Sequence, residues 1–183
     1  MARNSMGLIE LSSVAAGFQV CDAMLKAAQV DLLLARSICS GKYIVLVRGD
    51  VAAVQSSVQH GCQAGDFSVI DTFVIPNLHE SVFPAITGVN KAEALEALGI
   101  IESFSVASLI EAADAAVKTA NVKLIEIRLA MALGGKAFVT LTGSVAAVRS
   151  AVDAGAAVVA KKGLLTNKVV IPQPRAELLN EMI

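Results

Sequence analysis

The chain carries the same pattern of residues twice, and this repeat restricts its fold more than any other feature. Matching residues lie 92 positions apart in the first part of each copy and 94 positions apart in the second part, as in these pairs: Gly7 and Gly99, Glu10 and Glu102, Ser13 and Ser105, Asp22 and Asp114, Gly49 and Gly143, Val54 and Val148. Offsets held across so many positions predict two tandem copies of one domain. The offset changes after Arg128, so the loop that follows Arg128 is predicted to be two residues longer than its counterpart after Arg36.

Each copy shows the order strand, helix, strand, strand, helix, strand. In the first copy, the residue patterns predict strands at 7–14, 30–35, 43–47 and 68–75, and helices at 15–28 and 51–62. Asp50 is expected to cap the second helix, and Pro76 to end the last strand. This order predicts an α+β fold, an α/β sandwich of two tandem ferredoxin-like domains, each an antiparallel sheet flanked by helices. We place the domains at 5–88 and 97–183.

Composition excludes several classes of function. The formal net charge is −1, so the chain lacks the basic surface that nucleic-acid binding requires. Apolar residues make up 55% of the chain, yet no window of about 18 residues is free of charged or strongly polar side chains, so no membrane span is expected. Because residues 1–5 lead directly into the first strand pattern, we expect a cytoplasmic protein without a targeting signal. A soluble chain this apolar is expected to bury surface against other chains.

One cysteine stands out by its position. Cys39 lies in a short loop between two apolar runs of strand length, and the other residues of this loop are Ser37, Ile38, Ser40, Gly41 and Lys42. Gly41 and the serines favour a hairpin turn, which would expose the thiol. Exposed thiols are usually avoided, whereas a lone cysteine is most often a small apolar side chain. The residues alone leave two roles open for Cys39: it could be a metal ligand or a small apolar side chain.

The other cysteines favour structural roles. Three cysteines at uneven spacing argue against a disulfide framework. Cys21 lies on the apolar face of the first predicted helix, so we expect it to pack in the core. Cys62 lies near His60, but this pair has no further ligand nearby in sequence, and the second copy has alanine at the position of Cys62. A structural role for His60 and Cys62 is therefore favoured over a metal site.

Several motifs in both copies resemble those of bacterial microcompartment shell proteins, which are built from BMC domains. The motifs are a helix-end edge motif at 25–30 and 117–122, a strand motif ending in Arg48-Gly49-Asp50-Val51, and the terminal Val170-Ile171-Pro172-Gln173-Pro174-Arg175. They occur in order and cover nearly the whole chain. With Cys39 in its first loop, the chain is similar to tandem-domain shell proteins of the propanediol-utilisation type. Such relatives often have proline at the position of Ser40.

The resemblance implies an assembly and a cofactor. It implies a homotrimer with pseudo-hexameric symmetry that tiles, with other shell proteins, into a microcompartment shell within the cytoplasm. The Cys39 side chains of three copies would hold one [4Fe–4S] cluster per trimer at the central pore, which leaves one iron without a protein cysteine. The cluster would transfer electrons, or be exchanged, across the shell. Encapsulated redox enzymes are further implied partners.

The resemblance also assigns roles to other residues. The loop around Cys39 would line the first pore, and the second pore loop, which has no cysteine, would contain Leu133, Gly134, Gly135 and Lys136. The oligomer edge would contain Lys26, Lys118, His79 and Arg175. For Arg36 and Arg128, which precede the two loops, a structural role is favoured.

No motif of an enzyme is present, so a non-enzymatic protein is expected. The run Gly134-Gly135-Lys136 resembles a phosphate-binding loop only superficially, because it lacks the upstream glycine and the following Ser or Thr. Two alternatives to a cluster-bearing shell protein remain open. One is a shell tile with a metabolite-conducting pore and no cluster, and the other is a cytoplasmic small-molecule sensor with ferredoxin-like domains.

Overall fold

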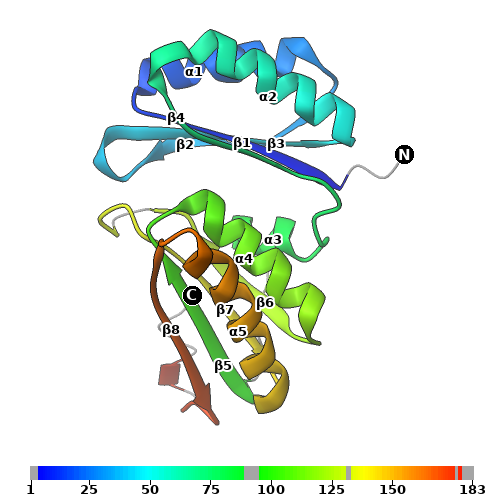
Figure 1. The fold of residues 1–183 in the computed structure, drawn as a ribbon, viewed down its shortest axis with the longest axis vertical. Coiled ribbons are helices and arrows are strands. Elements are labelled where there is room, and N and C mark those ends of the chain that lie inside the picture. The colour runs from blue at the N-terminus through cyan, green and yellow to red at the C-terminus, as the bar shows by residue number, and fades with distance from the viewer. Residues whose placement is uncertain (1–3, 89–94, 131–132, 176, 179–183) are drawn as a thin grey trace. The chain divides into compact units, whose positions relative to one another are not determined.

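The computed structural model describes residues 4–88, 95–130, 133–175 and 177–178. The chain forms two compact units, which divide between Leu78 and His79. Figure 1 shows each unit as a sheet with helices packed on it. We describe the two units separately.

The first unit contains one four-stranded antiparallel sheet with the strand order β2-β3-β1-β4. Its elements are β1 (Ser5–Leu11), α1 (Val14–Ala27), β2 (Asp31–Ile38), β3 (Lys42–Gly49), α2 (Val51–Gly65) and β4 (Val69–Ile75). Both helices cover the same face of this sheet (Figure 1). The predicted order of strands and helices is confirmed.

The second unit repeats this arrangement, with the strand order β6-β7-β5-β8. Its elements are α3 (Val82–Thr87), β5 (Ala97–Ser103), α4 (Val106–Thr119), β6 (Lys123–Arg128), β7 (Ala137–Gly143), α5 (Val145–Lys161) and β8 (Leu165–Pro172). Even the irregularities of the sheets recur: the register shifts at Leu32/Leu34 and at Glu10/Leu11 have counterparts at Leu124/Glu126 and at Glu102/Ser103. The prediction of two tandem α+β domains is therefore confirmed.

Each long helix begins at a side-chain cap. Asp50 accepts a hydrogen bond from the Ala53 N–H at 2.9 Å, as predicted, and Ser13, Ser105 and Ser144 cap the other three helices in the same way. These caps satisfy backbone donors that have no partner within the helix, and a cap is worth about 1 kcal/mol.

The core of the first unit lies between the sheet and its two helices. It contains Ile9, Leu11, Val20, Met24, Tyr43, Val45, Val47, Val54 and Val58. The helices approach the sheet closely where β1 has a glycine, since a Cβ at Gly7 would lie 2.6 Å from Val58 Cγ2. The matching Gly99 would meet Val152 at 2.7 Å, so both copies use the same close packing of a helix on the central strand.

The short helix α3 packs with the second unit. Its buried residues are Val82, Ala85 and Ile86, and it contacts β6 and α4. The sequence-based boundary at residue 88 placed this segment with the first domain. The structure divides the chain ten residues earlier, after Leu78, because the apolar side of α3 is buried by elements of the second unit. Within the described residues, no helix has the length and apolarity needed to cross a membrane.

Candidate metal centre at the first hairpin

Cys39 lies at the tip of the hairpin between β2 and β3. The last strand pair is Ile38 and Lys42, so the tip consists of Cys39, Ser40 and Gly41, which form a single 3-10 turn. Ser40 and Gly41 are exposed and both adopt left-handed backbone conformations, with φ of 64° and 73°. The predicted hairpin is present, and the Cys39 side chain in it is half-buried.

The base of the hairpin is anchored by an ion pair. Lys42 Nζ lies 2.7 Å from Glu10 Oε1 on the neighbouring strand β1, and the Glu10 side chain is only 8% exposed. The second unit repeats this contact, with Lys136 Nζ 2.6 Å from Glu102 Oε1. Because Lys42 is bound to β1, the tip itself consists of the thiol, the Ser40 hydroxyl and backbone groups.

The second loop is longer, as predicted from the change of offset. The pair Arg36 and Ile44 is separated by eight positions, whereas the matching pair Arg128 and Phe138 is separated by ten. Of the predicted second pore loop, Leu133, Gly134, Gly135 and Lys136 are described, and both glycines have left-handed conformations. Residues 131–132 lie outside the described residues.

Cys21 and Cys62 have a different environment from Cys39. Both pack against the core of the first unit. Burial raises the pKa of the Cys21 and Cys62 thiols, and the carboxylate of Asp22 adds to the effect at Cys21. These two cysteines therefore carry less of the thiolate that binds metals. His60 contacts the Ser56 carbonyl oxygen through Nδ1 at 2.8 Å.

No single copy of the chain brings a complete metal site together. Among the described residues, no group of three His, Cys, Asp or Glu side chains is placed to hold a metal ion. No cysteine forms a disulfide bond, and all three lie in the described part of the chain. An iron–sulfur cluster bound by Cys39 therefore requires thiols from further copies. One thiol per chain at a hairpin tip is compatible with such sharing.

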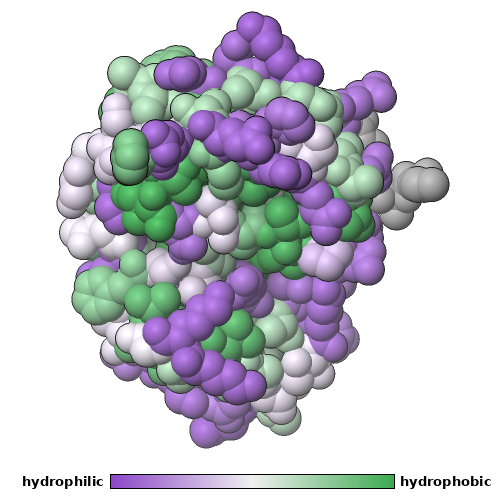
Figure 2. All heavy atoms as spheres, turned by 45° about the horizontal axis from the view of Figure 1, so that its top comes forward, coloured by the Kyte–Doolittle hydropathy of each residue, from purple (hydrophilic) through white to green (hydrophobic). Residues whose placement is uncertain are grey.

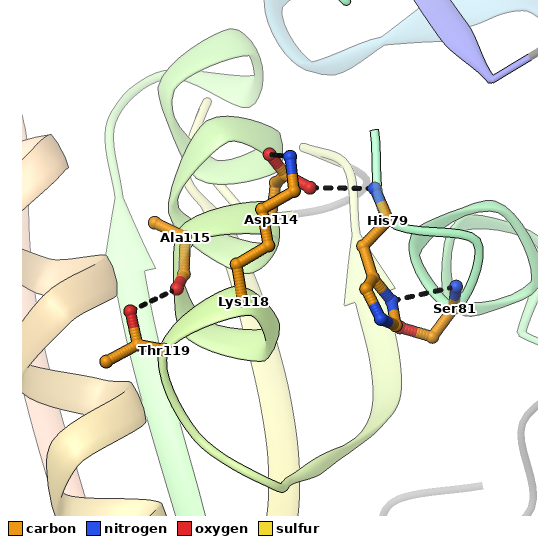
Figure 3. A network of polar contacts seen from close by, with 6 residues as sticks. All are labelled: His79, Ser81, Asp114, Ala115, Lys118 and Thr119. Carbon is orange, nitrogen blue, oxygen red and sulfur yellow. Dashed lines mark hydrogen bonds and ion pairs between the residues drawn. The ribbon is translucent and has the colours of Figure 1, made fainter. Parts of the chain in front are cut away.

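Three of the four predicted edge residues fall into two similar groups, one on each unit. In the second unit, Lys118 Nζ donates to Asp114 Oδ2 at 2.6 Å, and the His79 backbone N–H donates to Asp114 Oδ1 at 2.8 Å (Figure 3). In the first unit, Lys26 Nζ donates to Asp22 Oδ2 at 2.7 Å. The lysines were predicted, whereas the aspartates as their partners were missed. The signal was available, because both aspartates precede their lysine by four residues.

Of the other arginines named from the sequence, Arg175 and Arg128 pair with nearby glutamates. Arg175 Nη2 lies 2.7 Å from Glu177 Oε1, and this hydrogen bond lowers the pKa of the Glu177 carboxyl and raises the pKa of Arg175. Arg128 pairs with Glu126 at 2.7 Å and stacks over the Phe138 ring. Burial lowers the pKa of the Arg36 guanidinium.

Two units of this fold, each a four-stranded sheet under two helices and each with a hairpin loop, define a tandem microcompartment domain. The BMC domain model matches residues 5–78 and 97–174, and the chain therefore belongs to the BMC-domain family of microcompartment shell proteins. Over 179 residues it is 41% identical to bacterial microcompartment shell protein PduT of Citrobacter freundii, covering 98% of this chain and 97% of that protein.

A solved structure extends the similarity to three dimensions. A microcompartment protein from Desulfitobacterium hafniense DCB superposes with a TM-score of 0.94 at 55% identity, covering 98% of this chain and 99% of that one. The shell protein EutM of Salmonella typhimurium is 44% identical over 84 residues, which cover 46% of this chain and 85% of that protein. EutM thus matches a single domain, whereas PduT matches both.

Proposed function

We propose that this shell protein forms a homotrimer in which three copies of Cys39 hold one [4Fe–4S] cluster at the central pore. The protein is not an enzyme but a structural subunit of the shell. The cluster transfers electrons across the shell, or is itself exchanged across it. Its partners are other microcompartment shell proteins and, at the pore, encapsulated redox enzymes. The position of Cys39, the one cysteine at a hairpin tip, is the observation that carries the proposal.

Three copies are proposed from the symmetry of a ring of tandem domains, and this number fixes how many cysteine ligands the cluster has. Iron–sulfur clusters are held by cysteine thiolates, usually four, and one chain offers a single thiol at this tip. Closed cyclic symmetry is the usual arrangement for identical subunits. In a chain with two similar domains, three copies place six domains around an axis. Three thiolates then leave one iron for a ligand other than a cysteine of this protein.

The chain's own residues would hold and tune this site. Cys39 supplies the thiolate, and the N–H groups of Ser40 and Gly41, which follow it in the turn, are candidate backbone donors for its sulfur. Lys42 stays paired with Glu10 and fixes the base of the hairpin. When bound, the cluster supplies one-electron redox chemistry, and its potential depends on exposure and on hydrogen bonds to sulfur.

The test uses anaerobically purified full-length protein. We would measure the visible spectrum, and the iron and sulfide content per trimer, for the wild type and for Cys39→Ser. The expected result is broad absorption near 400 nm with about four irons per trimer in the wild type, and loss of both in Cys39→Ser. Cys21→Ala and Cys62→Ala are matched controls that should keep the cluster.

Two other outcomes decide between the alternatives. A wild type that forms trimers but holds neither iron nor sulfide contradicts the cluster and leaves a shell tile with a metabolite pore. A monomeric protein that binds a small molecule contradicts the trimer and favours a sensor.

A further inference from the structure

The two copies of the domain differ in how one face of their first helix is covered. On α1, Val14 is 39% exposed and Phe18 is 63% exposed. The matching residues of α4, Val106 and Ile110, are 2% and 0% exposed. These positions are spaced by four residues, so they lie on one face of the helix. Apolar side chains reach the surface between hydrophilic ones in Figure 2, where the helices of the first unit are turned forward.

A carboxylate on the same face shows the same contrast. The Asp22 side chain is 62% exposed, whereas that of Asp114 is 11% exposed. Both oxygens of Asp114 accept hydrogen bonds, one from Lys118 and one from the His79 backbone N–H (Figure 3). For Asp22, the only side-chain hydrogen bond among the described residues is with Lys26, at Oδ2. On α1, the Oδ1 position is thus available to a backbone donor.

The chain contains a second segment that corresponds to the one at His79. Arg175 lies 96 positions after His79, the same spacing that separates Pro76 and Pro172. The backbone also leaves both last strands in the same way, because Asn77 and Gln173 have left-handed φ values of 54° and 47°. In the described structure, the Arg175 side chain is 82% exposed and bound only to Glu177.

We infer that the α1 face of Val14, Phe18 and Asp22 binds residues 173–175 and 177–178 of a second copy of the chain. In this contact the Arg175 backbone N–H donates to Asp22 Oδ1, as the His79 N–H does to Asp114 Oδ1 within one chain. Leu178 corresponds to the buried Val82 and would cover apolar side chains of this face. The inference rests on the proposed trimer and adds the residues that close it.

The contact must be head-to-tail. The α1 face belongs to the first unit and residues 173–175 and 177–178 to the second, so each copy supplies one of each and a ring can close. Two α1 faces packed on each other would instead bring the two Asp22 carboxylates together, and like charges at close range are unfavourable.

Cross-linking with a short bifunctional thiol reagent tests this contact. The background is full-length Cys21→Ala, Cys39→Ser, Cys62→Ala, which removes the native thiols. Into it we would place Asp22→Cys in one preparation and Arg175→Cys in another. The two preparations would be mixed, dissociated and reassembled together. Cross-linking should then give dimers of one Asp22→Cys chain and one Arg175→Cys chain, whereas each preparation alone should give no dimers. The pair His79→Cys and Asp114→Cys in one chain is the positive control and should cross-link within the monomer.

The outcomes separate this inference from the proposed trimer. Background protein that is trimeric by native mass spectrometry, with no cross-link between positions 22 and 175, overturns the inference and leaves the trimer intact. Dimers from Asp22→Cys alone overturn it too, because they show α1 facing α1. Wild-type protein that is monomeric, together with no cross-link between positions 22 and 175 in the background, overturns both, because the wild type keeps Cys39.

A substitution series gives a second readout. Phe18→Glu should abolish the trimer and Asp22→Asn should weaken it. Size-exclusion chromatography with light scattering measures the oligomeric state of both variants. Gln55→Arg is the matched control, since it is exposed on α2 and gives the first unit the residue that the second has at Arg149. Unchanged circular dichroism would show that the variants fold. Equal behaviour of Phe18→Glu and Gln55→Arg would contradict the inference.

Discussion

The ring of Tyr43 occupies the space that a side chain at Gly17 would need. A Cβ built at Gly17 on α1 would lie 2.3 Å from Tyr43 Cδ1 on β3. The second unit has the reverse combination at the matching positions, Leu109 on the helix and Ala137 on the strand, and both are fully buried. In the first unit the strand supplies the large side chain of this helix–sheet contact, and in the second unit the helix supplies it.

This exchange predicts strong coupling between positions 17 and 43. Gly17→Leu alone should destabilise the protein by about 1 to 3 kcal/mol through overpacking, and Tyr43→Ala alone should leave a cavity. The double variant Gly17→Leu/Tyr43→Ala, which copies the second unit, should be more stable than the sum of the single changes allows. Thermal unfolding of the four proteins measures this coupling, and additive effects would argue against it.

The ion pair between Lys42 and Glu10 predicts unequal effects in the two units. Lys42→Met should cost about 2 kcal/mol, because the Glu10 carboxylate would stay buried without its partner. Lys136→Met should cost less, since the Glu102 side chain is 28% exposed and can be hydrated, compared with 8% for Glu10. Chemical denaturation of both variants checks this order. A larger loss for Lys136→Met would contradict it.

The left-handed conformation of Ser40 predicts how the hairpin tip responds to substitution. Ser40→Pro should destabilise the hairpin, because proline fixes φ near about −65° whereas Ser40 has a φ of 64°. Ser40→Gly should leave stability close to that of the wild type, since relief of about 1 kcal/mol of backbone strain offsets the greater freedom of glycine in the unfolded chain. Thermal unfolding distinguishes the two variants.

Cys21 and Cys62 predict a loss of stability at high pH. Burial raises the pKa of both thiols above the ordinary value of 9.0, so the folded state favours the protonated form. Their contribution to stability is complete below the pKa of the unfolded chain and is lost as pH rises through the folded pKa. The unfolding midpoint should therefore be level up to about pH 8 and fall above about pH 9.

The double variant Cys21→Ala/Cys62→Ala should flatten this decline between about pH 9 and 10. The second unit has alanine at both matching positions, Ala113 and Ala156, so alanine is compatible with this fold at both sites. Burial also raises the pKa of Tyr43, which acts at still higher pH and remains in the variant. An identical decline in wild type and variant would show that these thiols are not responsible.

The repeat explains why much of the fold could be predicted from the sequence. Matching positions such as Glu10 and Glu102 fix the order of elements, and the change of offset locates the longer loop after Arg128. The relation of Gly17 to Tyr43 could not be predicted, because it depends on how a helix and a strand meet in space. The position of α3 was missed for a similar reason: its apolar residues do not indicate which unit buries them.

The candidate site was predictable only in part. The apolar runs on either side of Cys39 predict the hairpin, and the lysines of the edge follow from the repeated motif. The second acceptor role of Asp114 depends on the His79 backbone, which carries no side-chain signal. The further thiols of the proposed cluster would come from other copies of the chain, and one sequence shows no sign of them beyond the single cysteine.

The different lengths of the two hairpin loops have a consequence for how such a pore can evolve. In a shell protein with one domain per chain, every substitution in the loop appears in every domain of the assembly. Here the tip with Cys39 and the longer loop with Gly134 and Gly135 are encoded separately within one polypeptide. Selection can therefore change one loop while the other keeps its shape, and the proposed trimer can thus carry three identical ligands in a ring of six domains.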